Sequence, residues 1–220
     1  MFPLRDSTPS KHFPVITVLL IIINIYIFYL ETKLGAQLEE FIYSFGMIPA
    51  NYYNYQTFLT GYYPFLTSIF LHGSWMHVIG NMWILWLFGD NVEDRMGKGR
   101  FLFFFLLCGI AAGISHFLVN PASTIPVVGA SGAVAGVMGA YFLMFHNAKV
   151  LTYIPPFFLI NLPAWIYLGL WIISQLWSGT VGLFTSVQYE QIAFWAHVGG
   201  FAAGMFLYRF FLRPDCKTPY

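Results

Sequence analysis

A serine and a histidine in two different apolar segments have the residue types of a nucleophile and its base. Ser131 lies in the run Gly129-Ala130-Ser131-Gly132, at the start of one apolar segment, and His197 lies in another near the C-terminal end. A serine hydroxyl is a poor nucleophile unless a base such as histidine takes its proton. The flanking glycines permit a tight turn and place Ser131 at a helix N-terminus, where free N–H groups stabilise an oxyanion. The pair therefore predicts acyl-transfer chemistry.

Two further polar side chains, His77 and Asn81, lie at the start of an earlier apolar segment. Their spacing of four residues places them on one face of a helix. Polar residues inside membrane segments are costly and are usually functional. Both residues are therefore candidates for the same site as Ser131 and His197.

The elements that carry these residues are long apolar blocks. The chain has 220 residues, of which 58% are hydrophobic and 9% are charged, whereas soluble domains have about 25% charged residues. A spanning helix needs about 20 apolar residues. We therefore predict an all-α, polytopic membrane protein with a single domain over residues 1–220. Its six transmembrane helices are expected at 14–34, 75–92, 100–119, 130–147, 157–177 and 192–212.

The basic residues predict which side of the membrane each connection faces, because Lys and Arg concentrate in cytoplasmic loops. If the N-terminus is cytoplasmic, one basic residue, Lys33, lies in the segments on the external side of the membrane. The inner segments carry Arg5, Lys11, Arg95, Lys98, Arg100, Lys149, Arg209, Arg213 and Lys217. Both termini are therefore expected in the cytoplasm, and segments two, four and six run from outside to inside. The four polar residues named above then share the outer third of the membrane, which indicates a single site.

The choice of His197 as the base rests on depth. His146 lies at the inner end of its segment, and His116, near the outer end of 100–119, is a weaker competitor. Segments 130–147 and 192–212 contain no Asp or Glu. We therefore predict a Ser-His dyad without a buried carboxylate, a variant of the triad arrangement.

Each feature taken alone has a simpler interpretation. A GxSG run in a glycine-rich membrane helix can serve packing only, as the spacing of Gly200 and Gly204 does. His197 can bridge two helices, and the pair His77 and Asn81 can do the same. The shared depth of the four residues favours the functional interpretation.

Other binding functions find less support. Three histidines, His72, His77 and His197, would suggest zinc, but no HExxH motif and no nearby carboxylate ligand are present, so neither a metal nor another cofactor is expected. We expect His72 to lie at the membrane interface. The net charge of +1 predicts no nucleic-acid partner, and Cys108 and Cys216 predict no disulfide.

In order and spacing, the motifs of the chain resemble those of the rhomboid intramembrane proteases, over nearly its whole length. The motifs are His72-Gly-Ser-Trp-Met-His77-Val-Ile-Gly-Asn81, Gly89 with Glu93-Asp-Arg95-Met-Gly97, Gly129-Ala-Ser131-Gly132, and Ala196-His197-Val-Gly-Gly200 with Gly204. The resemblance implies a six-helix core, Ser131 as nucleophile and His197 as base. It implies an oxyanion site from the side chains of His77 and Asn81 and the backbone of Ser131.

The resemblance also implies the setting of the reaction. Substrates would be single-pass transmembrane proteins, cut near their outer end beside a small residue. We expect a multi-pass protein of the bacterial plasma membrane, with the lipid bilayer as its surroundings.

Two positions depart from the family's pattern. Many members have Trp-Arg in the first loop where this chain has Tyr63-Pro64. Some members have a Tyr one turn after the serine that stacks on the histidine, where this chain has Ala135. Another residue must therefore orient His197.

Two other functions fit a polytopic membrane protein. A rhomboid-like protein that binds membrane clients without cutting them would not need the intact Ser131 and His197. A small transporter would show repeat symmetry and broken helix pairs, which the sequence does not show.

Overall fold

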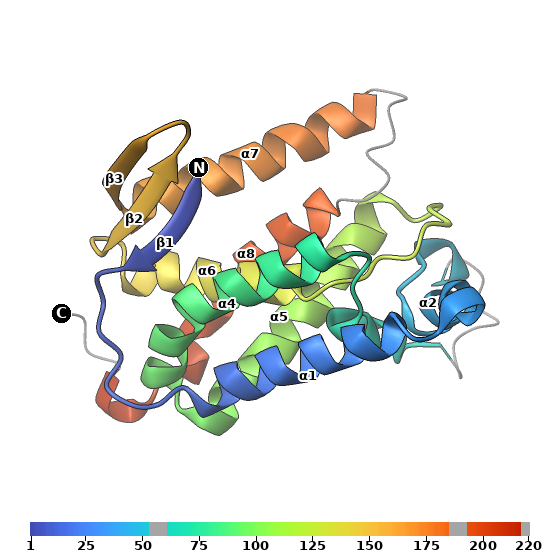
Figure 1. The fold of residues 1–220 in the computed structure, drawn as a ribbon, viewed down its shortest axis with the longest axis horizontal. Coiled ribbons are helices and arrows are strands. Elements are labelled where there is room, and N and C mark those ends of the chain that lie inside the picture. The colour runs from blue at the N-terminus through green and yellow to red at the C-terminus, as the bar shows by residue number, and fades with distance from the viewer. Residues whose placement is uncertain (53–60, 185–192, 217–220) are drawn as a thin grey trace.

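Six long helices form most of the computed structural model, which describes residues 1–52, 61–184 and 193–216 (Figure 1). They are α1 (Val15–Glu31), α4 (Trp75–Met96), α5 (Lys98–Val119), α6 (Ser131–Met144), α7 (Ala164–Phe184) and α8 (Phe194–Phe211). Each helix overlaps one of the six expected segments. The largest difference is at the fifth, which was expected to start at 157 and starts at Ala164.

Two of the described helices, α5 and α7, are long and apolar enough to cross a membrane. A third crossing is counted if α1 and the bent segment after it, Gly35–Phe45, form one span; the two parts meet at 113°. The helix that starts at Ser131 is apolar but has only 14 residues. The fold is therefore mostly helical with two or three candidate spans in the described residues, and six spans stay a prediction.

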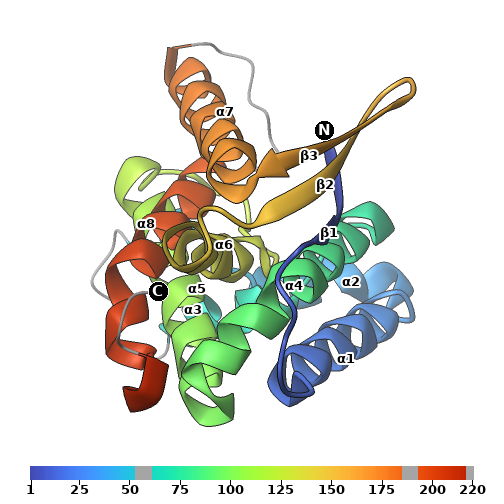
Figure 2. The ribbon, with the colours of Figure 1, turned by 90° about the vertical axis from the view of Figure 1, so that its left-hand side faces the viewer.

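The helix α6 is the centre of the bundle. Its residues from Gly132 to Tyr141 are all buried. It packs against α4, α5, α7 and α8, and Figure 2 shows these four helices arranged around it. The N-terminus of this buried helix carries Ser131, so the serine is held at the end of the element around which the other helices pack.

Glycines bring the backbones of α6 and α8 into direct contact, as the sequence predicts. A Cβ atom added to Gly200 would lie 2.0 Å from the carbonyl oxygen of Gly132, and one added to Gly204 would lie 1.9 Å from that of Gly136. Both distances are far below any van der Waals contact. No side chain larger than hydrogen fits at these positions, so the glycines fix the separation of the two helices.

The motif Glu93-Asp94-Arg95 connects helix ends at the end of the bundle opposite to Ser131. The carboxylate of Glu93, 3% exposed, accepts the backbone N–H groups of Ile16 and Thr17 at 3.0 and 2.8 Å. It thereby satisfies free N–H groups in the first turn of α1. The carbonyl of Arg95 accepts the N–H of Arg213 at 3.0 Å, after α8. The motif therefore holds three helix ends together.

A three-stranded antiparallel sheet covers the end of α6 that is remote from Ser131. Its strands are β1 (Phe2–Asp6), β2 (Lys149–Ile154) and β3 (Phe158–Pro163), in the order β1-β2-β3. The expectation of an all-α fold is wrong here, and β3 is the reason why α7 starts late. The strands are short, and β1 and β2 are far apart in the sequence, so no local pattern predicts their pairing.

The connection between α1 and α4 contains several short helices. These are η1 (Gly35–Gln37), α2 (Leu38–Phe45), η2 (Pro49–Tyr52), α3 (Pro64–Thr67) and η4 (Ser68–Phe70). Tyr63, at the position that departs from the family's pattern, donates its hydroxyl to the carbonyl of Ser44 at 2.9 Å. Pro64 is the first residue of α3, a position that proline favours. Tyr63 therefore anchors this connection to α2.

The contact between α6 and α8 gives a stability prediction. Because Gly204→Ala would force the two backbones apart, we expect it to lower the free energy of unfolding by about 1–3 kcal/mol. The measurement is the unfolding midpoint in detergent micelles. The control is Gly169→Ala on α7, whose added Cβ would meet nothing within 4 Å. Equal midpoints for the two variants would show that the helices are not in contact at Gly204.

Candidate active site

The structure brings Ser131 and His197 into hydrogen-bonding contact. Ser131 is the first residue of α6 and His197 is the fourth residue of α8. The Nε2 atom of His197 lies 2.8 Å from the Oγ atom of Ser131. The contact follows directly from the backbone approach at Gly132 and Gly200, one residue and three residues away along the two helices.

Two residues of the helix α7 contact the imidazole of His197. The Oε1 atom of Gln175 lies 2.8 Å from the Nδ1 atom of His197. The indole of Trp171, one turn earlier, lies beside the imidazole, with ring centroids 5.8 Å apart and planes inclined by 36°. These two residues contact the imidazole in a chain that has Ala135 where some family members have the stacking Tyr.

Sequence reasoning missed both α7 residues, although one signal was present. Gln175 is an amide inside a mainly apolar segment, and such residues in membrane helices are costly unless they have a partner. Trp171 carried no such signal, because aromatic residues are common throughout this chain, at 20%.

His77 and Asn81 face the backbone just before the serine. Gly129 has φ +125°, a conformation that residues with a side chain rarely adopt. A Cβ atom on Gly129 would lie 2.6 Å from Nε2 of His77 and 3.6 Å from Nδ2 of Asn81. The N–H of Gly129 donates to the carbonyl of Ser68 at 2.9 Å, which fixes the turn. The two side chains predicted from their i, i+4 spacing therefore converge on the loop that presents Ser131.

His72 also lies in this cluster. It is 2% exposed, and its Nε2 atom lies 3.1 Å from Nδ2 of Asn81. Burial in this turn before α4 lowers the pKa of His72 to about 3, so the ring is neutral and can accept a hydrogen bond from the Asn81 amide. The carboxylate of Glu31 accepts the backbone N–H of His72 at 3.3 Å. His72 therefore orients Asn81.

Neither competing histidine makes the bond to Ser131 in the described structure. His116 on α5 has a buried Nδ1 atom without a hydrogen-bond partner, and the bond to Ser131 is made by His197. His146 lies beyond the opposite end of α6, where its carbonyl accepts the N–H of Trp165. Within the described residues, no three His, Cys, Asp or Glu side chains are close enough to hold a metal ion.

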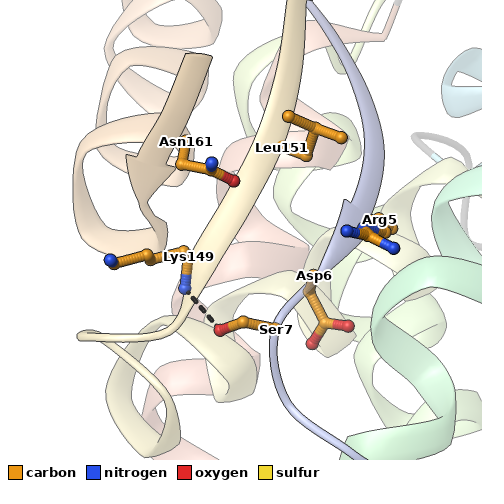
Figure 3. A pocket seen from close by; sticks show the side chains of 6 residues that line it. All are labelled: Arg5, Asp6, Ser7, Lys149, Leu151 and Asn161. Atoms are coloured by element: carbon orange, nitrogen blue, oxygen red, sulfur yellow. Dashed lines mark hydrogen bonds between the residues drawn. The ribbon is translucent and has the colours of Figure 1, made fainter. Parts of the chain in front are cut away.

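A shallow pocket lies at the sheet, on the side of the protein remote from the serine. Figure 3 shows that β1 and β2 border it and that the N–H of Lys149 donates to the hydroxyl of Ser7, at 2.9 Å. Its lining consists of Arg5, Asp6, Ser7, Lys149, Leu151 and Asn161. None of these residues belongs to the cluster around Ser131, so the pocket is not part of the candidate active site.

Comparison with known proteins places this arrangement in a family. The model of the rhomboid domain matches residues 59–214, well over half of the chain. The chain is 34% identical over 139 residues to rhomboid protease GluP of Bacillus subtilis. The aligned stretch is 62% of this chain and 26% of that protein.

Two relatives from organelles are also similar. Rhomboid-like protein 11, chloroplastic, of Arabidopsis thaliana is 37% identical over 84 residues, which are 38% of this chain and 29% of that protein. Rhomboid protein 1, mitochondrial, of Saccharomyces cerevisiae is 26% identical over 152 residues, which are 67% of this chain and 41% of that protein. The chain thus spans less than half the length of these curated relatives. With the family model matched over most of its length, the chain belongs to the rhomboid family.

Proposed function

We propose that this chain is an intramembrane serine endopeptidase in which Ser131 is the nucleophile and His197 the general base. The observation that carries the proposal is the distance of 2.8 Å between Oγ of Ser131 and Nε2 of His197. This is the geometry required of a nucleophile and its base. The name of the relative GluP, a rhomboid protease, supports the same reaction class.

The reaction begins with attack of the Ser131 hydroxyl on a backbone carbonyl of the substrate. Nε2 of His197 takes the hydroxyl proton and then gives it to the leaving amine, as in the serine triads. Water then attacks the acyl-enzyme with the same histidine as base. No carboxylate takes part, since the partner of Nδ1 is the neutral amide of Gln175.

The oxyanion of the tetrahedral intermediate would be stabilised by three groups. They are the side chains of His77 and Asn81 and the backbone N–H of Ser131 at the N-terminus of α6. The proximity of both side chains to Gly129 supports this assignment. The hydrogen bond between Asn81 and the neutral His72 holds the amide in place before substrate arrives, and such preorganisation is what makes oxyanion sites effective.

The setting we propose is a multi-pass protein of a bacterial plasma membrane with six spans and both termini in the cytoplasm. Contacts between the basic segments support a common inner side. The guanidinium of Arg100 donates to the carbonyl of Leu212 at 2.8 Å, and the N–H of Lys11 donates to Asp94 at 3.2 Å. Lys217 lies outside the described residues. Substrates would be single-pass transmembrane proteins cut near their outer end.

A rhomboid-like protein that binds clients without cutting them is the alternative. A serine-directed fluorophosphonate separates the two functions, because it labels only a serine activated by its base. Labelling that requires Ser131 supports the protease, and no labelling of the folded protein supports the binding function.

The dyad gives the first functional prediction. We expect Ser131→Ala and His197→Ala each to abolish cleavage of a model transmembrane substrate, because either change removes the activated nucleophile. Cleavage is measured in liposomes, and folding is checked by the unfolding midpoint. The controls are Ser178→Ala on α7 and His146→Ala, which lie outside the cluster and should keep wild-type turnover. Wild-type turnover in either dyad variant would overturn the assignment.

The oxyanion role of Asn81 makes a separate prediction. Loss of one oxyanion donor lowers kcat by about 10²–10³-fold, so Asn81→Ala should lower kcat by this factor with little change in KM. Asn24→Ala is the control, because Asn24 is a buried amide in α1 that donates to the carbonyl of Leu20. The control should affect stability and not kcat. Normal kcat with a raised KM in Asn81→Ala would assign Asn81 to substrate binding instead.

The orientation can be measured by cysteine labelling. We expect Thr124→Cys, in the loop before Ser131, to react with an impermeant thiol reagent added to intact cells, and Lys149→Cys not to react. Both positions are exposed, so the difference reports the side of the membrane. The background is Cys216→Ser, since the remaining Cys108 is buried. Labelling of Lys149→Cys alone would place the active site at the cytoplasmic side.

A further inference from the structure

The hydrogen bond between Gln175 and His197 is one link in a longer chain of polar groups. The hydroxyl of Ser174 lies 2.6 Å from the carbonyl oxygen of Trp171, and Nε2 of Gln175 lies 3.1 Å from Oγ of Ser174. Oε1 of Gln175 lies 2.8 Å from Nδ1 of His197, whose Nε2 lies 2.8 Å from Oγ of Ser131. Four consecutive bonds thus run from a backbone carbonyl of α7 to the nucleophile.

The chemistry of these groups gives every bond in the chain one direction. A carbonyl oxygen only accepts, so the Ser174 hydroxyl donates its single proton to Trp171. The Ser174 oxygen can then only accept, and it accepts an N–H of the Gln175 amide. This leaves the Gln175 oxygen toward His197, where it can only accept the N–H of Nδ1. In the neutral imidazole the Nε2 atom is then unprotonated and accepts the proton of Ser131.

We propose that Gln175, oriented by Ser174, is a positioning residue that holds His197 in the tautomer with the proton on Nδ1. The proposal rests on the proposed function, since this is the tautomer in which Nε2 can act as the base. It assigns to an amide the role that a carboxylate has in serine triads. An amide needs a second contact for this role, because a flipped amide would donate to Nδ1 and place the proton on Nε2. Ser174 provides that contact.

The placement of both groups on α7 has a consequence for the site. Trp171 and Gln175 are one turn apart, and each contacts His197. The described part of α7 packs against α8 and, through fewer contacts, against α6, β2 and β3, and Figures 1 and 2 show it at the edge of the bundle. A displacement of α7 away from α8 would therefore remove both contacts to the base while the contact of α6 and α8 persists. The tautomer of His197 thus depends on the position of α7.

The first test replaces Gln175 by the similarly sized Leu, which cannot accept a hydrogen bond. In this variant the buried N–H of Nδ1 of His197 loses its acceptor. The free-energy cost of the unpaired donor predicts a fall in kcat of about 10–100-fold, with little change in KM. Gln175→Glu keeps an acceptor oxygen and should retain kcat within about 10-fold of wild type by the same reasoning. Thr180→Val, on the exposed surface of the same helix, is the control and should match wild type.

The second measurement reads the tautomer directly and needs no activity. The ¹⁵N chemical shifts of the His197 ring nitrogens, assigned by comparison with His197→Ala, distinguish protonated from unprotonated Nδ1. We expect Nδ1 to be protonated in wild type and in Gln175→Glu. We expect a mixture of tautomers in Gln175→Leu, and a smaller shift in the same direction in Ser174→Ala, because the amide is then free to flip.

The outcomes separate this proposal from the proposed function. Unchanged kcat and an unchanged tautomer in Gln175→Leu would overturn the positioning role while leaving the protease assignment intact. A wild type that cleaves no substrate but shows Nδ1 protonated, with the proton lost in Gln175→Leu, would overturn the protease assignment and leave the positioning role intact. A fall in kcat with an unchanged tautomer would show a structural role for Gln175 and also overturn the proposal.

Discussion

The direct backbone contact between α6 and α8 is the constraint on which the candidate site depends. A Cβ on Gly200 or Gly204 would lie about 2 Å from the carbonyl oxygen of Gly132 or Gly136. This close approach lets the hydroxyl of Ser131 and the imidazole of His197 meet at 2.8 Å. The glycines are therefore structural residues with a chemical consequence, since they set the distance across which a proton is transferred.

A second constraint is that the polar groups must be buried without net charge. The side chains in contact around the nucleophile are Ser, His, Asn and Gln, all of which are neutral when the histidines are unprotonated. Burying an isolated charge in an apolar surrounding is far more costly than burying a hydrogen-bonded neutral group. Among the described residues, the buried side chains of Glu31 and Glu93 instead accept backbone N–H groups near helix ends, from His72 and from Ile16 and Thr17. Neutral groups therefore surround the nucleophile, and Glu31 reaches the site only through the backbone N–H of His72.

The sequence predicts those parts of the site that have a local pattern. Ser131 between glycines, the GxxxG spacing on α8, and the i, i+4 pair His77 and Asn81 can each be recognised in one segment. The structure brings them together as their shared depth indicates. The burial of His72 has no local signal, because it depends on contacts from α1, at Phe28 and Glu31, which are distant in sequence.

Other features depend on pairings that no local pattern carries. The sheet joins β1 at the N-terminal end to β2 more than a hundred residues later, and a short strand next to a predicted helix looks like the start of that helix. This is why the fifth segment was expected too early. Gln175 is a polar residue in an apolar segment, as a functional residue often is. Its partner His197 becomes evident only when α7 is packed beside α8. A residue whose role depends on contacts with distant parts of the sequence can be recognised only from the structure.

The length of α6 connects the fold to access for water. A helix of 14 residues is about 21 Å long at 1.5 Å per residue, whereas the hydrocarbon core of a bilayer is about 30 Å thick. In the proposed six-span arrangement, α6 starts at Ser131 and ends at the inner side, so it falls about 9 Å short of the outer surface by the same figures. The loop that ends at Gly129 occupies the part of the bilayer thickness that α6 does not span. Irregular backbone at membrane depth is tolerated only inside protein or beside water. In that arrangement the short central helix would place the nucleophile below the membrane surface and would require a polar path above it, which hydrolysis of an acyl-enzyme also needs.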